Sequence, residues 1–516
     1  MCDEFEDCGI VEAPVTCIKK TKDERCRRCK CICNYYNVNC YRTYKCDQGP
    51  PGPPGGDVPI VLPSNRFSTG KGTCFIYEDK LYIVGQSNTI YGTSTDNNLT
   101  ATVLNVVDPP SKWVKVLTLH TSIMALGSNG RVYMSGVNTN GELGNGTTGS
   151  PQYYMTPVRN DSDSGELIGI CDIAAPSDSG ESTLMAVHSS GLLYVWGLGT
   201  NGCLGNGTTP AAITLPTLVT YFNIQTNELA VKSVTIGNAG DNCHFAAITH
   251  GNTAVTWGDQ SDGCLGNLIA LSTPVPAPFA VFPELNCFKS AHISGNNIRF
   301  LLFDGTTMAA GANLVGELGN GNQTQNNVFE FSVESGSDVL IQNLTKVEMV
   351  GDTTYTVALD KSGKLWFCGT NSRGQAGSGA TTDIINGFLE ITHDQEICNF
   401  WVYGFNATTS FILFQDSTGK VYGSGSNLLG QLAIGNVTAE ILTFTETLID
   451  PRIAISSMQL YGTTNGTENN CGCAMISLED GSAVGIGDPV AGQLGVWTDF
   501  SQIDIQPSPR SVIGFE

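Results

Sequence analysis

The stretch Gly191-Leu-Leu-Tyr-Val-Trp-Gly197, followed by Asn201-Gly-Cys-Leu-Gly-Asn-Gly207, decides the fold of this chain. Its first part is a short apolar run bounded by glycines, which is typical of a buried β-strand. In the second part the glycines permit positive φ and close backbone approach, and Asn-Gly closes a tight turn. The lone Leu204 can then pack between neighbouring layers. We therefore interpret this motif as structural.

The same pattern returns along the chain, and each copy places a strand that ends in Gly before Gly-x-Leu-Gly. The signature residues of the five clearest copies are Gly141, Leu143 and Gly144; Gly202, Leu204 and Gly205; Gly263, Leu265 and Gly266; Gly316, Leu318 and Gly319; and Gly492, Leu494 and Gly495. Decayed forms stand at 374–377 and 430–432. The eight strand-ending glycines, from Gly85 to Gly487, lie 51 to 62 residues apart. This period indicates one four-stranded propeller blade per repeat.

These repeats resemble the regulator of chromosome condensation repeat family over most of the chain. The resemblance implies an all-β fold, a single closed β-propeller that has seven blades in the family's usual form. Because eight strand-ending glycines are present, the blade number stays open between seven and eight. Pairing of residues 58–62 with residues 507–513 would close the ring and remove an exposed sheet edge.

Composition limits the classes of partner. The chain has 516 residues, of which only 14% are charged, and it has 60 glycines, so turns and short strands are favoured over long surface helices. Its net charge of −22 repels phosphate backbones and anionic lipid, so nucleic acid is not the expected principal partner. No apolar run reaches the roughly 18 residues of a membrane span, and the first residues are acidic. We expect neither membrane insertion nor export through a secretory signal.

Cysteine and proline divide the chain into three predicted regions. Residues 1–47 form a cysteine-rich head with nine Lys/Arg and eight Asp/Glu, so the acidity belongs to the remainder. Residues 48–57 contain Gly-Pro-Pro triplets and resemble a short collagen-like spacer. Three triplets are too few for a triple helix alone, so a stiff spacer of about 25 Å or a weak trimerising contact are the two interpretations. Residues 58–516 form the propeller.

The cysteines of the head allow three kinds of chemistry. The close spacing of Cys26, Cys29, Cys31 and Cys33 could supply four thiolates to zinc, although it differs from a two-pair zinc ribbon. Disulfide cross-linking is the rival interpretation, because so short a segment lacks a core, and a nine-cysteine head leaves one thiol over. A reduced tail or an acyl anchor is the third. The cross-linking candidates are Cys2, Cys8, Cys17, Cys40 and Cys46.

The remaining motifs favour structure over chemistry. The six histidines form no His-Glu-x-x-His, and Gly-x-Ser-x-Gly is absent, so we expect no enzyme and no cofactor other than zinc in the head. Side chains at similar places in successive repeats are interpreted as core or packing residues, and Asp161–Glu166 as a solvated acidic loop. The repeated packing residues are His120, His188 and His244; Trp196, Trp257 and Trp366; and Cys203 and Cys264.

Two functions are compatible with these features. The first is a non-enzymatic structural or interaction protein, because the head, spacer and propeller together resemble surface or fibre proteins of large DNA viruses. It predicts protein partners, a homo-oligomer or larger assembly through the N-terminus, and a virion location. The alternative is a cytoplasmic adaptor or guanine-nucleotide exchange factor for a small GTPase, as the family resemblance implies. No catalytic residue is predicted in either case.

Overall fold

A computed structural model of the chain describes residues 98–119, 122–176, 183–209, 211–222, 227–239, 242–260, 262–268, 273–277, 285, 287–350, 355–404, 410–451 and 455–461. It also describes short segments at 29–32, 41–44, 67–69, 72–77, 79–85, 473–478, 483–487 and 506–511. The chain divides into two compact units, Met1–Val58 and Pro59–Glu516. In the first unit β1 (Cys29–Ile32) pairs antiparallel with β2 (Tyr41–Tyr44).

The second unit is all-β, as the sequence predicts, and its described strands form eight four-stranded antiparallel sheets. We number these sheets I to VIII and letter the strands of each A to D in chain order. The A strands are β3 (Phe67–Thr69), β7 (Trp113–Thr118), β11 (Ile170–Ala174), β15 (Val231–Ala239), β19 (Phe288–Ser294), β23 (Leu344–Val350), β27 (Ile397–Tyr403) and β31 (Ile455–Tyr461). The B strands are β4 (Gly72–Tyr77), β8 (Ser122–Gly127), β12 (Thr183–His188), β16 (Asn242–Thr249), β20 (Asn297–Leu302), β24 (Tyr355–Asp360), β28 (Phe411–Asp416) and β32 (Cys473–Leu478).

Each sheet is completed by two outer strands. The C strands are β5 (Lys80–Gly85), β9 (Val132–Gly136), β13 (Leu193–Leu198), β17 (Ala254–Gly258), β21 (Thr307–Gly311), β25 (Leu365–Gly369), β29 (Val421–Asn427) and β33 (Ala483–Gly487). The D strands are β6 (Asn98–Val103), β10 (Gln152–Pro157), β14 (Ala212–Leu218), β18 (Thr273–Ala277), β22 (Asn326–Phe331), β26 (Ile384–Ile391), β30 (Thr438–Glu446) and β34 (Gln506–Ser511). Within the described connections, short 3-10 helices lie at Thr200–Gly202, Thr220–Phe222 and Asn227–Leu229.

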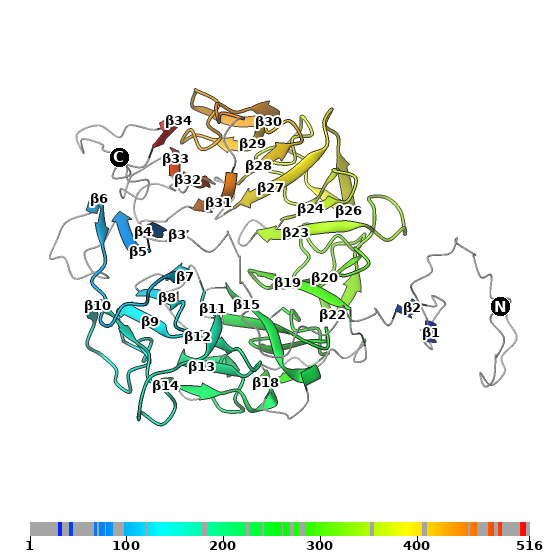
Figure 1. Cartoon of the computed structure of the whole chain (residues 1–516). Helices are drawn as coiled ribbons and strands as arrows, with labels where there is room; N and C mark the ends of the chain where they lie inside the picture. The colour runs from blue at the N-terminus through cyan, green and yellow to red at the C-terminus, as the bar shows by residue number, and fades with distance from the viewer. Residues whose placement is uncertain are drawn as a thin grey trace, which may run out of the picture. The chain divides into compact units, whose positions relative to one another are not determined.

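The sheets stand side by side around a common centre, and their A strands lie nearest to it (Figure 1). Each A strand contacts the A strand of the next sheet, and β31 contacts β3, so the series returns to its start. No shared sheet joins the two ends of the series within the described residues, because β34 pairs with β33 and β3 with β4. The predicted pairing that would close the ring is therefore not seen, and its partner segment 58–62 lies outside the described residues.

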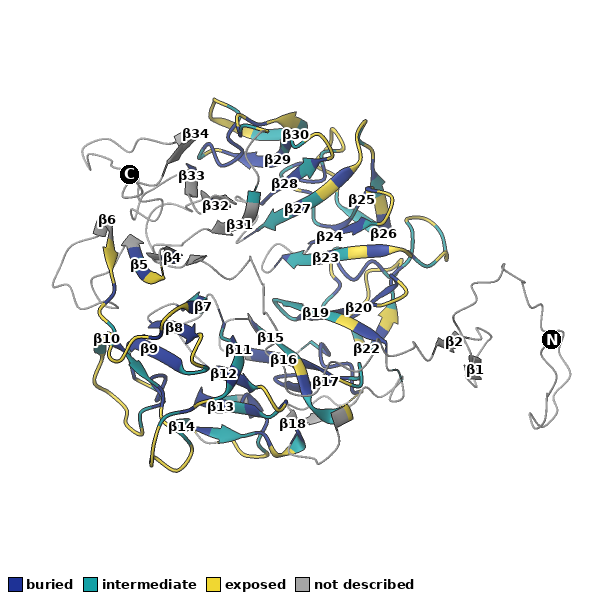
Figure 2. Cartoon of the chain, viewed as in Figure 1, coloured by how far each residue is buried: buried dark blue, intermediate teal, exposed yellow. Residues whose placement is uncertain are grey.

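Burial follows the layers of each sheet. The B and C strands are almost wholly buried, whereas most residues of the D strands are partly or fully exposed (Figure 2). Hydrophobic clusters lie between neighbouring sheets, and one of them joins Met185 of sheet III to Phe245 and Trp257 of sheet IV. Because an antiparallel sheet with two covered faces buries both sides of its middle strands, the B and C strands are short continuous apolar runs.

Candidate interaction surfaces

Strand direction sorts the connections into two ends of the ring. Successive strands of every sheet are antiparallel, so the A–B and C–D connections begin at one end and the B–C turns and D–A connections at the other. We call these the AB/CD end and the BC/DA end. Every signature segment is a C–D connection, since it follows the strand-ending glycine.

The signature segments are inserted between sheets instead of being displayed to solvent. The described signature leucines, Leu143, Leu204, Leu265 and Leu318, are at most 1% exposed. Their second glycines lie against side chains of the next sheet or of their own D strand. A Cβ on Gly205, whose φ is +62°, would lie 2.6 Å from Nε1 of Trp257, and one on Gly266, whose φ is +64°, would meet the ring of Phe329. These positions therefore require glycine.

A buried asparagine amide holds the signature segment in place in sheets II, V, VI and VII, and the sequence analysis missed it. The Oδ1 of Asn138 accepts from the N–H of Leu143 at 3.0 Å, and its Nδ2 donates to the carbonyl of Thr147 at 3.0 Å. The same two bonds recur at the equivalent asparagines of sheets V, VI and VII, which are Asn313, Asn371 and Asn427. The signal was an Asn five residues before the signature Leu or Ala.

The next sheet donates a further hydrogen bond to the residue before the signature leucine. Trp196 Nε1 donates to the carbonyl of Glu142 at 2.8 Å, and Trp257 Nε1 to that of Cys203 at 3.1 Å. In sheet VII the hydroxyl of Ser424 makes the equivalent bond to Gln375, at 2.6 Å. Backbone carbonyls deep in the ring are thus satisfied from the neighbouring sheet.

Two predicted equivalences are wrong. Trp196 and Trp257 are fully buried beside strand-ending glycines, but Trp366 lies three residues before Gly369, is partly exposed and donates to Asp360 Oδ2 at 3.1 Å. The histidines also differ in place, since His188 ends a B strand and His244 lies near the start of one. His120 lies outside the described residues.

Cys203 is not a simple packing residue, as the sequence analysis expected, because it forms a disulfide with Cys243. The bond joins the signature segment of sheet III to the B strand of sheet IV, with 5.9 Å between the Cα atoms. The equivalent Cys264 is free and buried. Two neighbouring repeats therefore use the same position differently.

Cys264 and His244 form the pair most similar to a catalytic dyad, with 3.2 Å between Sγ and Nδ1. Burial, followed by the charges of Asp259 and Asp262, raises the pKa of the Cys264 thiol. Burial also lowers the pKa of His244, whose Nδ1 lies 2.9 Å from the carbonyl of Asp259. A protonated thiol beside a neutral buried imidazole is a poor nucleophile, so this pair is part of the core.

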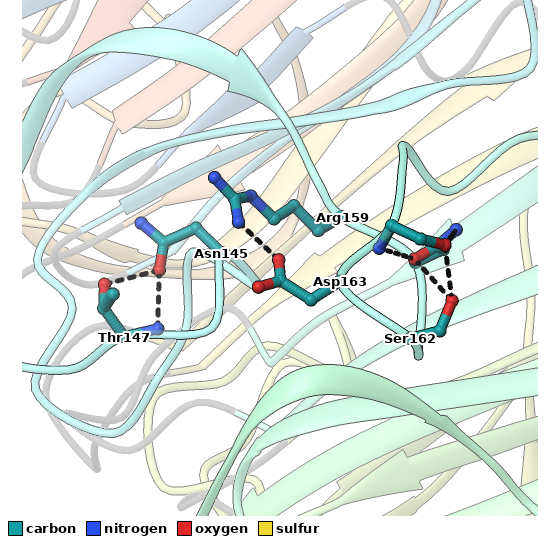
Figure 3. A network of polar contacts seen from close by, with 7 residues as sticks. Asn145, Thr147, Arg159, Ser162 and Asp163 are labelled. Carbon is teal, nitrogen blue, oxygen red and sulfur yellow. Dashed lines mark hydrogen bonds and ion pairs between the residues drawn. The ribbon is translucent and has the colours of Figure 1, made fainter.

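The acidic loop at residues 161–166 is closed by its own contacts, as Figure 3 shows. Asp163 pairs with Arg159, and Asn160 Oδ1 accepts from the N–H of Ser164 at 3.0 Å. Glu166 pairs with Arg131 at 2.8 Å. Within the described residues no set of three His, Cys, Asp or Glu side chains forms a metal site.

Several predicted residues lie outside the described residues or have no described side chain. Cys29 and Cys31 lie in β1, where only the backbone pairing is described. The residues not described are Cys2, Cys8, Cys17, Cys26, Cys33, Cys40, Cys46, Gly492, Leu494 and Gly495. Zinc binding and cross-linking through the head therefore remain predictions. In the part of the chain that is described, no helix has the length and hydropathy of a membrane span.

The BC/DA end combines charged residues with exposed apolar side chains, while the AB/CD end exposes apolar residues such as Leu314, at 80%, and Leu268, at 58%. Most charged residues of the described connections lie at the BC/DA end, and large apolar side chains stand among them. Ile168 is 61% exposed, Val339 56% and Leu448 56%, on the D–A connections after sheets II, V and VII. Carboxylates lie close to two of these residues in the sequence. Glu166 is two residues before Ile168, and Asp338 directly precedes Val339.

The chain is an all-β repeat protein with an RCC1-like propeller fold. Three features define this class: the ring of sheets, the signature segments inserted between them, and the connections that face outward. Residues 190–239 match the model of the Regulator of chromosome condensation (RCC1) repeat. That stretch begins in the B–C turn of sheet III and ends in the A strand of sheet IV. The matched sequence repeat is thus offset from the sheet and takes in strands of both sheet III and sheet IV.

Comparison with known proteins agrees with this fold. The Ultraviolet-B receptor UVR8 of Arabidopsis thaliana is 26% identical over 260 residues, 50% of this chain and 54% of the receptor. This chain thus spans about half the length of that relative. The crystal structure of human WBSCR16 has a TM-score of 0.51 at 17% identity and covers 74% of this chain and 93% of its own. Prp20p of Saccharomyces cerevisiae has a TM-score of 0.50 at 13% identity, with coverages of 76% and 90%.

Proposed function

We propose that this chain is a non-enzymatic protein-binding platform whose partner docks on the BC/DA end. The observation that carries the proposal is the exposure of Ile168, Val339 and Leu448 on three D–A connections of one ring. Exposed apolar side chains surrounded by polar groups are typical anchors of protein interfaces. Ile168 and Leu448 lie two residues from a strand end, and the carbonyl of Val339 accepts from the N–H of Glu334, so little conformational entropy is lost when a partner binds.

The two ends of the ring support this choice of surface. At the AB/CD end the polar side chains of the signature segments are bonded to their own backbone, as Asn138 and Asn371 illustrate. At the BC/DA end the connections differ in length and charge from sheet to sheet. Side chains that vary on a constant scaffold are where recognition usually resides.

Relatives support the class of function. Members with this fold include a receptor, UVR8, and Prp20p, whose crystal structure was described together with its binding to Gsp1p and histones. Those partners are the relatives' own. For this chain the likeness supports an interaction or regulatory role.

The test is quantitative affinity capture with the full chain from its native source. We expect the Ile168→Asp, Val339→Asp, Leu448→Asp triple variant to lose a partner that the wild type retains, by about tenfold or more, which corresponds to roughly 1.4 kcal/mol. Leu314→Asp is the matched control, because Leu314 is 80% exposed at the AB/CD end. A partner set unchanged in the triple variant, or lost equally in both variants, contradicts the proposal.

The narrower roles remain predictions. A virion component that is cross-linked through the head predicts covalent multimers that collapse with reductant, and monomers on non-reducing gels would refute it. An exchange factor predicts accelerated nucleotide release from a small GTPase, and a panel without acceleration would refute that role. Location in a virion, or otherwise in the cytoplasm, is decided by fractionation of native material.

A further inference from the structure

A row of cationic and aromatic side chains crosses sheets IV, V and VI at the BC/DA end. Its members, which we call the cationic row, are all exposed: Lys232, His250, Lys289, Phe303 and Lys361. The two lysines at 232 and 289 are second residues of A strands, and the other three are first residues of B–C turns. They are far apart in the sequence, so only the ring brings them together.

Two of the lysines occupy β-bulges. The ladder between the A and B strands shifts register between Val231 and Ser233 in sheet IV, and between Phe288 and Ser290 in sheet V. Lys232 and Lys289 are the residues inside these shifts. The same shift occurs in the A–B ladders of sheets II, III, VI, VII and VIII, so the bulge belongs to the blade, and here it turns a lysine out of the regular alternation.

Contacts between sheets make the row continuous. Lys232 Nζ of sheet IV lies 5.4 Å from the ring centroid of Phe303 in sheet V. Lys289 Nζ of sheet V donates to the carbonyl of Thr345, at the start of the A strand of sheet VI, at 2.8 Å. The B–C turn that carries Lys361 is bonded to the residue just before that strand, with its N–H donating to Asn343 at 2.9 Å.

Like charges act on one another along the row. Burial, and after it the charge of Lys361, lowers the pKa of Lys289. Burial, and after it the charge of Lys232, lowers the pKa of His250. Lys289 and Lys361, on neighbouring sheets, therefore lie within electrostatic reach of each other, as do Lys232 and His250 of sheet IV.

The three lysines of the row form no ion pair with any described carboxylate, although the chain is strongly acidic. Two other exposed lysines are paired, Lys364 with Glu390 at 2.9 Å and Lys420 with Glu446 at 2.8 Å, whereas exposed Lys112 is unpaired like the row. Adjacent unpaired cations repel each other and reduce stability. An anion bound across the row would offset this repulsion.

We propose that the cationic row binds an acidic peptide segment of a partner protein, with an apolar side chain of that segment against Phe303. The proposal rests on the proposed function and names the chemistry of the partner. Charge complementarity favours carboxylates, and Phe303, which is 43% exposed, adds an apolar contact that a bare anion would not use. The three lysines project from three neighbouring sheets, so the row suits an extended segment.

The test measures fluorescence anisotropy of a labelled peptide in which Glu and Asp flank one Phe. We expect the Lys232→Gln, Lys289→Gln, Lys361→Gln triple variant of the full chain to bind about tenfold or more weakly than wild type, and Phe303→Ala to weaken binding as well. Higher ionic strength should also weaken binding. Lys112→Gln is the matched control, because Lys112 is an exposed unpaired lysine of the same end outside the row.

The outcomes separate this proposal from the broader one. Equal peptide binding by wild type and the triple lysine variant overturns the cationic row, as does displacement of the peptide by single-stranded RNA that binds more tightly. If a partner is lost from the apolar triple variant but is still captured by the lysine triple variant, the row is refuted and the platform is left intact. Peptide binding that needs the lysines, with capture unaffected by the apolar variants, supports the row and refutes Ile168, Val339 and Leu448 as the anchors of the platform. An unchanged melting temperature shows that the variants are folded.

Discussion

The signature segments and the BC/DA end differ in where their side chains go. Leu318 and Asn313 of one signature segment are buried and bonded within the ring, whereas Ile168 and Lys289 at the BC/DA end reach solvent. The signature segments stabilise the ring, and the BC/DA end is the surface that we propose for partner binding. The comparison teaches that the most recognisable motif of this chain is not its binding surface.

The largest expected effect is in the core between sheets. Trp257→Ala should lower the free energy of unfolding by about 3–5 kcal/mol, because it removes a fully buried ring and leaves the carbonyl of Cys203 without its donor. Chemical denaturation measures it. Trp366→Ala, at a partly exposed ring, serves as the control and should cost less. Equal losses would contradict the division between the two tryptophans.

The inter-sheet disulfide should have the next largest effect. Replacing Cys203 and Cys243 by Ser should cost about 2–4 kcal/mol, since the bond spans a sequence separation of 40 residues. Reductant should destabilise wild type and leave the double variant unchanged in the same denaturation assay. Cys398→Ser, at an exposed free thiol, is the control. Free thiols at both positions in native protein, found by mass spectrometry, would refute the bond.

The buried asparagines should contribute less individually. Asn371→Ala removes the acceptor for the N–H of Ala376 at 2.9 Å and the donor to Ala380 at 2.9 Å, so we expect a loss of about 1–3 kcal/mol. Its neighbour Ser372 is exposed, and Ser372→Ala should change stability by less than about 0.5 kcal/mol. Thermal melts of the two variants compare them directly. Similar melting temperatures would show that the amide is dispensable.

The stability contribution of Glu142 in the signature segment of sheet II should depend on pH. Burial raises the pKa of Glu142, against hydrogen bonds that lower it, while sheet VI has Gln375 at the same position. A carboxyl whose pKa is raised on folding contributes stability that is complete below its unfolded pKa and is lost as the pH rises through the folded pKa. Glu142→Gln should therefore be more stable than wild type near pH 7 and lose this advantage near pH 4. Parallel melts at both pH values test this, and a constant difference would contradict it.

The smallest expected effect on stability belongs to the BC/DA end. Val339→Ser should change the free energy of unfolding by less than about 0.5 kcal/mol, because its side chain is 56% exposed. The same urea titration used for the core variants measures it. A decrease of several kcal/mol in the free energy of unfolding would mean that Val339 stabilises the ring and would contradict its role as a free binding residue.

The fold could be predicted from the sequence because its signal is local and repeated. Glycines such as Gly205 and Gly266, and the leucines beside them, recur with the blade period, and the structure places them between sheets. The roles of Trp366, Cys203 and His188 could not be predicted, because equivalence was judged by approximate spacing. A shift of a few residues along a strand changes the residues that a side chain contacts and can move it to the other face of the sheet.

The candidate site was beyond prediction for a different reason. Lys232, Lys289 and Lys361 look like scattered surface charges in the sequence, and the bulges that direct two of them leave no local signature. The amides of Asn138 and Asn371 were visible as a recurring Asn, yet only their bonds reveal what they do.

The sequence by itself determined an all-β ring of repeated four-stranded units, since glycine positions and short apolar runs act through local conformation and through burial between neighbours. Only the tertiary structure decided which side chains of different sheets meet, including the Cys203–Cys243 bond and the cationic row. Contacts between residues some 50 positions apart depend on how each sheet is turned against the next, and that geometry is a property of the whole ring.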